Sequence, residues 1–235
     1  MFVIRQIHKY LGISVAVLLL ISAVTGFLRA NYVWYWKPGY KQHKHPITED
    51  SRYIQAPGIG ISELETIIVK KGGVAKIKSL ELLNLCGRLL YKVYADNGVL
   101  VVDAMTGELL TPIREDFAIE IATQYVSGSF PVKNITDLRD YVPFKGHNPH
   151  QVYRVNFDDN GNTEIFIDKY SGDVVEELDN RRRFAQFIVN LHDFNFLNLK
   201  RTLLCILGLS LVSLSVSGIF LFCRNSRQEI TLSGR

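Results

Sequence analysis

Two of the six histidines lie beside long apolar runs of the sequence. His8 precedes the uncharged run 13–28, and His192 lies in the segment FAQFIVNLHDFNFLNLKR, shortly before the run 202–223. Imidazole nitrogen binds iron well, and ionisable groups at membrane depth tend to be functional. Both positions are therefore candidates for ligand chemistry at a membrane helix.

The apolar runs predict two transmembrane helices, at residues 10–30 and 200–223, because each approaches the roughly 20 residues that cross a hydrocarbon layer. The first leads into the aromatic cluster NYVWYWKPGY without a small-residue cleavage site, which indicates an uncleaved anchor. Two crossings place the tails 1–9 and 224–235 on one side and the domain 31–199 on the other. Basic residues flank the runs on both sides, so the charge count does not determine the orientation.

Composition excludes several classes of function. Lys and Arg total 27 against 23 Asp and Glu, and the excess lies mostly at the membrane borders, which suggests membrane lipids or anionic cofactor groups as partners and not nucleic acid. Of three cysteines only Cys86 lies in the predicted domain, which excludes a disulfide within it and a cysteine metal cluster in one chain. No phosphate loop, dinucleotide fingerprint or hydrolase triad is visible, so electrons for any redox reaction would come from another protein or a quinone.

The domain contains an internal repeat. Its two copies are LLYKVYADNGVLVVDAMTGELL (89–110) and QVYRVNFDDNGNTEIFIDKYSGDVV (151–175). Each has a strand with alternating apolar and polar residues, a turn and a second such strand, and then an Asp followed by a Thr-Gly or Ser-Gly turn. Asn97-Gly98 and Asn160-Gly161 predict tight hairpins.

A helical pattern precedes each hairpin. The first, at 61–73, has Ser62 as the expected N-cap and Gly72 as the stop, and the second, at 114–126, has acidic residues in its first turn. The expected fold class is α+β, with two helix-plus-antiparallel-hairpin repeats at about 61–110 and 114–177 and an amphipathic lead-in at 181–199.

These motifs together resemble the PepSY domain and the PepSY-associated transmembrane family. The hairpins ending in VVDAMTGELL and IFIDKYSGDVV resemble the domain, and the segments IHKYLG with Thr25-Gly26 and Leu191-His192 with SGIFLFCR resemble the paired membrane motifs of the family. The resemblance implies an inner-membrane, multi-pass protein of bacteria, with cytoplasmic termini and a periplasmic domain. Family members include larger ferrisiderophore reductases with four transmembrane helices, which carry b-type haem and pass electrons outward for iron release.

The resemblance makes His8 and His192 candidate axial ligands of haem b. His8 shares one helical face with a stripe of mostly small residues, which lets another helix approach closely: Gly12, Val15, Leu19, Ser22 and Gly26. If the second helix is continuous, His192 shares a face with Leu199, Leu203, Ser210 and Ser217. The two histidines would lie at opposite membrane surfaces, which suits two haems in series.

Simpler interpretations stand beside the haem hypothesis. His8 could contact headgroups, and His192 could lie in an interfacial turn. His45 could reach His192 as a second axial ligand, although His43 and His45, like His147 and His150, are more typical of solvated loop residues.

Two helices cannot enclose a haem, so a homodimer, or a complex with another helix pair, is expected. A two-fold axis would pair each histidine with its symmetry mate. The negative charge of the haem propionates would be offset by Lys9 and Arg5 near His8, and by Arg201 and Lys200 near His192. The sequence leaves two functions open. One is a haem-dependent ferric siderophore reductase or electron-transfer protein, and the other is a non-enzymatic, membrane-anchored PepSY module that binds or regulates an extracytoplasmic protein.

Overall fold

The computed structural model describes residues 2–31, 56–73, 76–126, 130–144, 146–195 and 200–233, without the side chains of 2–4, 200, 201, 203, 221 and 223–233. The chain divides into two compact units. The helical unit comprises Met1–Trp36 and Phe184–Arg235, and the sheet unit comprises Lys37–Arg183.

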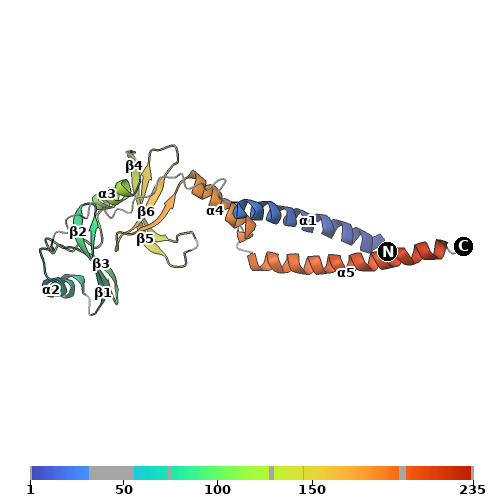
Figure 1. The fold of residues 1–235 in the computed structure, drawn as a ribbon, viewed down its shortest axis with the longest axis horizontal. Helices are drawn as coiled ribbons and strands as arrows, with labels where there is room; N and C mark the ends of the chain where they lie inside the picture. The colour runs from blue at the N-terminus through green and yellow to red at the C-terminus, as the bar shows by residue number, and fades with distance from the viewer. Residues whose placement is uncertain are drawn as a thin grey trace. The chain divides into compact units, whose positions relative to one another are not determined.

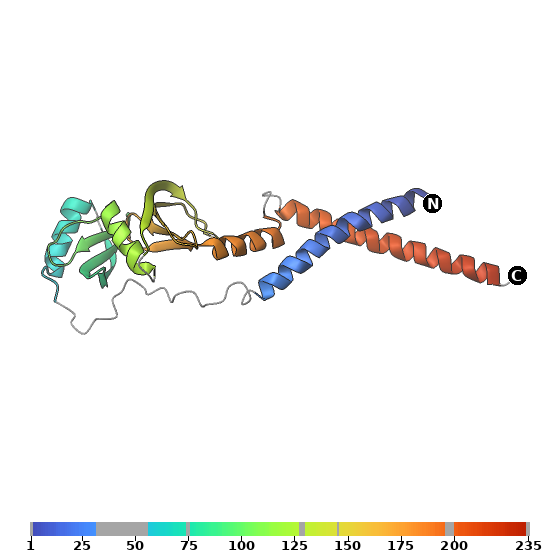
Figure 2. The ribbon, with the colours of Figure 1, turned by 90° about the horizontal axis from the view of Figure 1, so that it is seen from above.

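The helical unit is built from α1 (Phe2–Ala30), α5 (Lys200–Ser233) and most of α4 (Asn180–His192). α1 and α5 run antiparallel and side by side, so that the two termini lie at the same end of this unit (Figures 1 and 2). One narrow face of α1 is covered, with Val15 and Thr25 buried. Leu18 lies on this face in place of the expected Leu19, which is 41% exposed.

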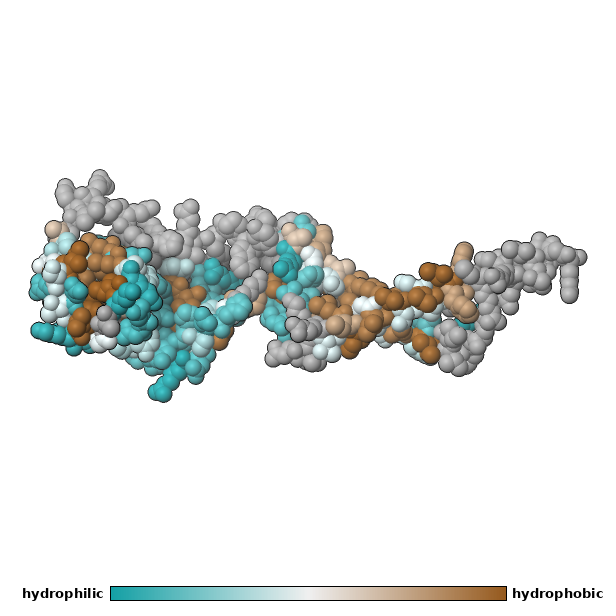
Figure 3. All heavy atoms as spheres, turned by 90° about the horizontal axis from the view of Figure 1, so that it is seen from below, coloured by the Kyte–Doolittle hydropathy of each residue, from teal (hydrophilic) through white to brown (hydrophobic). Residues whose placement is uncertain are grey.

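The outer surfaces of α1 and α5 are apolar. Exposed Ile, Leu, Val and Phe side chains cover both helices (Figure 3). Among the described residues, Arg5–Ala30 alone is long and apolar enough to cross a membrane, and the apolar stretch Leu204–Phe220 of α5 is shorter. α5 continues as a helix to Ser233, beyond the end of the apolar run.

α4 ends at His192 and does not continue into α5. The chain turns directly after it, where Phe194 has a positive φ of 53°. The continuous helix considered from sequence for the His192 face is therefore not present, although Ser210 and Ser217 do lie on the partly covered face of α5.

Two antiparallel sheets form the sheet unit, which confirms the α+β class. The first sheet has the order β1 (Ile77–Leu85), β2 (Arg88–Ala95) and β3 (Gly98–Asp103). The second has the order β4 (Val132–Tyr141), β5 (His150–Phe157), β6 (Glu164–Asp168) and β7 (Val174–Leu178).

Each sheet has its own helix. α2 (Ile61–Gly72) packs on one face of the first sheet through Leu64 and Ile68. α3 (Glu115–Tyr125) packs on the second sheet, and its buried face also contacts residues of the first sheet, such as Leu90. Because one apolar cluster contains both sheets, the two repeats share a core.

The repeat predicted from sequence is confirmed in detail at the turn that ends each half. In both turns the aspartate Oδ1 accepts hydrogen bonds from the backbone N–H groups two and three residues later, and a glycine follows with φ above 70°. The first turn contains Asp103, Met105, Thr106 and Gly107. The second contains Asp168, Tyr170, Ser171 and Gly172.

Two local predictions were wrong. The N-cap of α2 is Gly60, and Ser62 lies inside the first turn, while Gly73 adopts the left-handed conformation just past the predicted stop. Asn160-Gly161 does not form a tight hairpin, because residues 158–163 connect β5 to β6 and the positive φ falls on Asn162. The Asn97-Gly98 hairpin is confirmed by the pairing of Ala95 with Gly98.

Candidate functional site

His8 lies against α5 in what we call the His8 socket, formed with Ser217 and Gly218. The Nδ1 atom of His8 lies 2.7 Å from Ser217 Oγ. Ser217 Oγ also lies 3.1 Å from Leu214 O, so its single proton can go to that carbonyl, with Oγ accepting from His8 Nδ1–H, or to His8 Nδ1 itself. A Cβ atom at Gly218 would lie 3.6 Å from His8 Cε1, which places the ring edge directly over the glycine.

His192 lies against α1 in the His192 socket, formed with Ser22, Thr25 and Gly26. Its Nδ1 atom is 3.2 Å from both Ser22 O and Thr25 Oγ1. The carbonyl can only accept, and Thr25 Oγ1 donates to Ile21 O at 2.6 Å, so both oxygens accept from His192 Nδ1–H. A Cβ atom at Gly26 would lie only 3.0 Å from His192 Cε1, which makes glycine necessary for this approach.

Both sockets hold the histidine through the same ring nitrogen, Nδ1. When the proton is on Nδ1, the lone pair lies on Nε2, the nitrogen that then can bind a metal. Among the described residues, neither Nε2 atom has a hydrogen-bond partner. In each socket Nε2 is thus the ring nitrogen that the described chain does not use.

The two sockets are built in the same way but with the helices exchanged. α1 supplies the histidine to one and the hydroxyl and glycine to the other. Seventeen residues of helix separate His8 from Thr25, which is roughly 26 Å at the usual rise. The two histidines of one chain therefore cannot bind the same metal ion, as expected from the sequence.

An ion pair lies beside the His192 socket. Arg29 Nη1 is 3.1 Å from Asp193 Oδ1, and both side chains are partly exposed, at 45% and 30%. The sequence analysis did not single out this pair. The available signal was position in the chain, because Arg29 follows Gly26 by three residues and Asp193 directly follows His192.

The other predicted site residues lie elsewhere or outside the described part. Lys9 is exposed next to His8. His45, with His43, lies outside the described residues, as does the side chain of Arg201. Within the described ranges, no group of three His, Cys, Asp or Glu side chains could hold a metal ion.

His147 and His150 both lie in the sheet unit. His147 is exposed, and His150 Nδ1 donates to Asp168 Oδ2 at 3.0 Å. Burial raises the pKa of Asp168, but hydrogen bonds from Ser171 N–H, His150 and Tyr170 N–H lower it by more, so the pKa is below its ordinary value. His150 therefore stabilises the second turn of the repeat.

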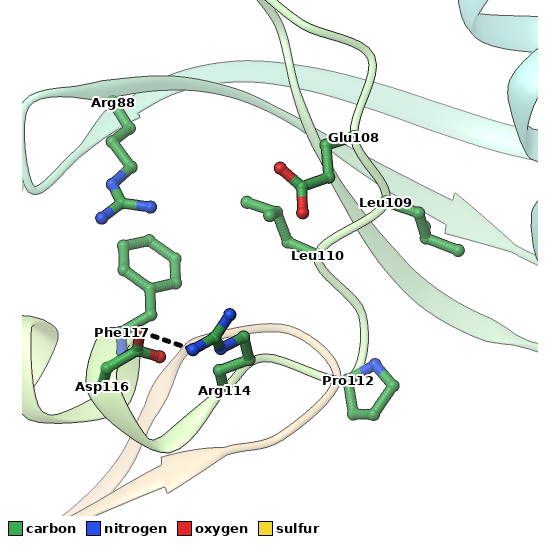
Figure 4. Close-up of a pocket in the computed structure, with 8 residues that line it drawn as sticks. All are labelled: Arg88, Glu108, Leu109, Leu110, Pro112, Arg114, Asp116 and Phe117. Atoms are coloured by element: carbon green, nitrogen blue, oxygen red, sulfur yellow. Dashed lines mark hydrogen bonds and ion pairs between the residues drawn. The ribbon is translucent and has the colours of Figure 1, made fainter.

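The sheet unit also contains a pocket of about 190 Å³ beside the start of α3 (Figure 4). Arg88 lies over the ring of Phe117, 4.8 Å from its centre, and Arg114 pairs with Asp116 at 3.3 Å. Glu108 and apolar side chains form the rest of the wall. This lining could accommodate a small polar group but contains no nucleophile and base in contact.

The apolar helices and the α+β sheet unit together define a membrane-anchored protein. The family model of the PepSY-associated TM region matches residues 5–235. The chain therefore belongs to the PepSY-associated transmembrane family, as its sequence motifs indicated. Among curated proteins, no sequence matches this chain.

Proposed function

We propose that this membrane protein binds b-type haem at the His8 and His192 sockets and moves electrons across the bilayer. The observation that carries the proposal is that both imidazoles make their hydrogen bonds through Nδ1, so that Nε2 has no partner among the described residues. Histidine nitrogen is a common axial ligand of haem iron. When bound, haem supplies one-electron exchange between ferric and ferrous iron.

A second copy of the chain completes each site. One chain provides one histidine at each level, whereas b-type haem with two axial imidazoles requires two. In a homodimer related by a two-fold axis normal to the membrane, each level would contain two histidines and two glycines on four helices. The histidines would bind iron, and the glycines would let the imidazole rings lie close to the facing helices.

The proposed direction of transfer uses the orientation that the sequence resemblance implies. We propose that α1 and α5 both span the bacterial inner membrane, with the sheet unit in the periplasm. The apolar stretch Leu204–Phe220, with its antiparallel contacts to α1, supports α5 as the second span. Electrons would come from a donor protein or a quinone and would reduce a ferric siderophore or another iron source outside.

Absorption spectra of the purified full chain test this proposal. We expect a Soret band and an α-band that sharpens on dithionite reduction. His8→Ala and His192→Ala should each remove about half of the pigment, because each removes both ligands of one level in the dimer. His147→Ala, which changes an exposed histidine of the sheet unit, should retain all of it.

Two results would contradict the proposal. One is a colourless protein purified from haem-replete cells, and the other is full pigment in both socket variants. Size measurement of the pigmented protein tests the dimer, since a monomer with bound haem would exclude the two-copy arrangement.

The pocket beside α3 favours a second candidate function. Its charged and apolar wall, with the Glu108 carboxylate directed inward (Figure 4), suits a segment of an extracytoplasmic protein. A colourless full chain that loses partner binding on Glu108→Gln would support this non-enzymatic function of an anchored PepSY module.

A further inference from the structure

We propose that Arg29 is the counter-cation for the haem propionate at the His192 socket and that Asp193 holds its guanidinium in place. This inference rests on the proposed function, since it concerns the haem bound through His192. The prediction from sequence that Arg201 has this role stays untested, because the Arg201 side chain lies outside the described residues.

The position of Arg29 relative to the socket supports the assignment. Arg29 follows Gly26 by three residues on α1, which places both on one side of the helix about 4.5 Å apart along its axis. His192 Cε1 lies over Gly26. Arg29 therefore lies about one helical turn along α1 from the glycine that the imidazole contacts.

The chemistry of Arg29 matches a carboxylate ligand. A guanidinium presents several N–H donors in a fixed plane and can bind two carboxylates at once. Its Nη1 atom contacts Asp193 Oδ1 at 3.1 Å, and 45% of the side chain remains exposed. The remaining N–H groups are thus accessible to a second carboxylate, which a propionate would provide.

Asp193 and Arg29 carry opposite charges, so their effects on the midpoint potential of the haem can be told apart by measurement. Asp193 directly follows His192, so its negative charge lies close to any iron bound there. A nearby positive charge stabilises the reduced haem, which carries one positive charge fewer, and a nearby negative charge stabilises the oxidised haem. Arg29 and Asp193 should therefore change the midpoint potential of this haem in opposite directions.

Reductive potentiometry of the haem-loaded full chain tests the proposal. The His8→Ala background isolates the His192 haem, and the same measurement with both haems present serves if that variant is not obtained. We expect Arg29→Gln to lower the midpoint potential and to reduce haem retention. Asp193→Asn should raise the potential, Arg29→Lys should lie between wild type and Arg29→Gln, and Arg139→Gln, an exposed arginine of β4, should match wild type.

The outcomes separate this inference from the proposed function. If Arg29→Gln and Asp193→Asn shift the potential in the same direction, or leave it unchanged while both lose haem equally, the pair only fastens α4 to α1 and the inference is wrong. If the wild-type chain binds no haem, the proposed function fails and the inference fails with it.

Discussion

Gly26→Ala should weaken haem binding at the His192 socket and spare the His8 socket. The new Cβ would lie 3.0 Å from Cε1 of His192, which is tighter than a normal contact, and 3.5 Å from Nδ1, which is an ordinary contact. The ring must move by a few tenths of an ångström, which lengthens its 3.2 Å hydrogen bond to Ser22 O. Overpacking of this kind costs about 1–3 kcal/mol, which corresponds to roughly 5- to 150-fold weaker binding.

Two glycines serve as controls for this prediction. A Cβ at Gly218 would lie 3.6 Å from His8 Cε1, an ordinary contact, and a Cβ at Gly208 meets no atom of the described chain within 4 Å. Alanine also favours a helix over glycine by about 1 kcal/mol, so a general loss of helix stability is not expected. Haem titrations of the three full-chain variants, followed at the Soret band, measure the affinity of each site. Equal affinities for Gly26→Ala and Gly208→Ala would refute the argument from contact distance.

Three further predictions concern the sheet unit. Gly107→Ala should lower the free energy of unfolding in urea by about 1 kcal/mol more than Gly172→Ala. Both glycines have φ above 70°, but a Cβ at 107 would lie 2.7 Å from the Ile67 Cδ1 methyl of α2, whereas the nearest atom to a Cβ at 172 is 3.7 Å away. Equal losses would show that the Ile67 side chain moves aside. Because the pKa of Asp168 is lowered in the folded state, its stabilisation should be present above the ordinary value of 3.8 and lost as the pH falls through the lowered one. Asp168→Asn should therefore flatten the decline of melting temperature on the acid side, and an unchanged slope would contradict this. Burial raises the pKa of Cys86 to about 12. In a variant that lacks the two cysteines of α5, Cys205 and Cys223, a thiol reagent should therefore label Cys86 only after unfolding. Rapid labelling of the native chain would refute the prediction.

The sequence predicted the repeat but not its full strand content. Hairpin alternation and the Asp-x-x-Ser/Thr-Gly turns were recognisable because each depends on residues close in the chain. β1 and β4 were missed because both are edge strands that lack a fully buried face: most side chains of β1 are exposed, and those of β4 are exposed or only partly buried, so neither alternates clearly between apolar and polar residues.

The residues that meet in the two sockets were recognisable as sequence motifs, but their pairing was not. His8, Thr25-Gly26 and Ser217-Gly218 lie in or beside apolar runs, and His192 lies in the amphipathic lead-in to the second run. Helical periodicity assigns a face within one helix, but it does not state which residues of another helix lie opposite. The exchange of partners depends on the turn after His192 and on the contact between α1 and α5, which sequence spacing does not determine.

This exchange makes α1 and the α4–α5 segment dependent on each other. Neither of them holds a histidine together with its own hydroxyl and glycine, so neither can build a half-site alone. Loss of one segment would abolish both sockets at once, and a helix shifted by one turn would misplace both. Because the sockets lie near opposite ends of α1, both form only when the two segments pack in one register along their length.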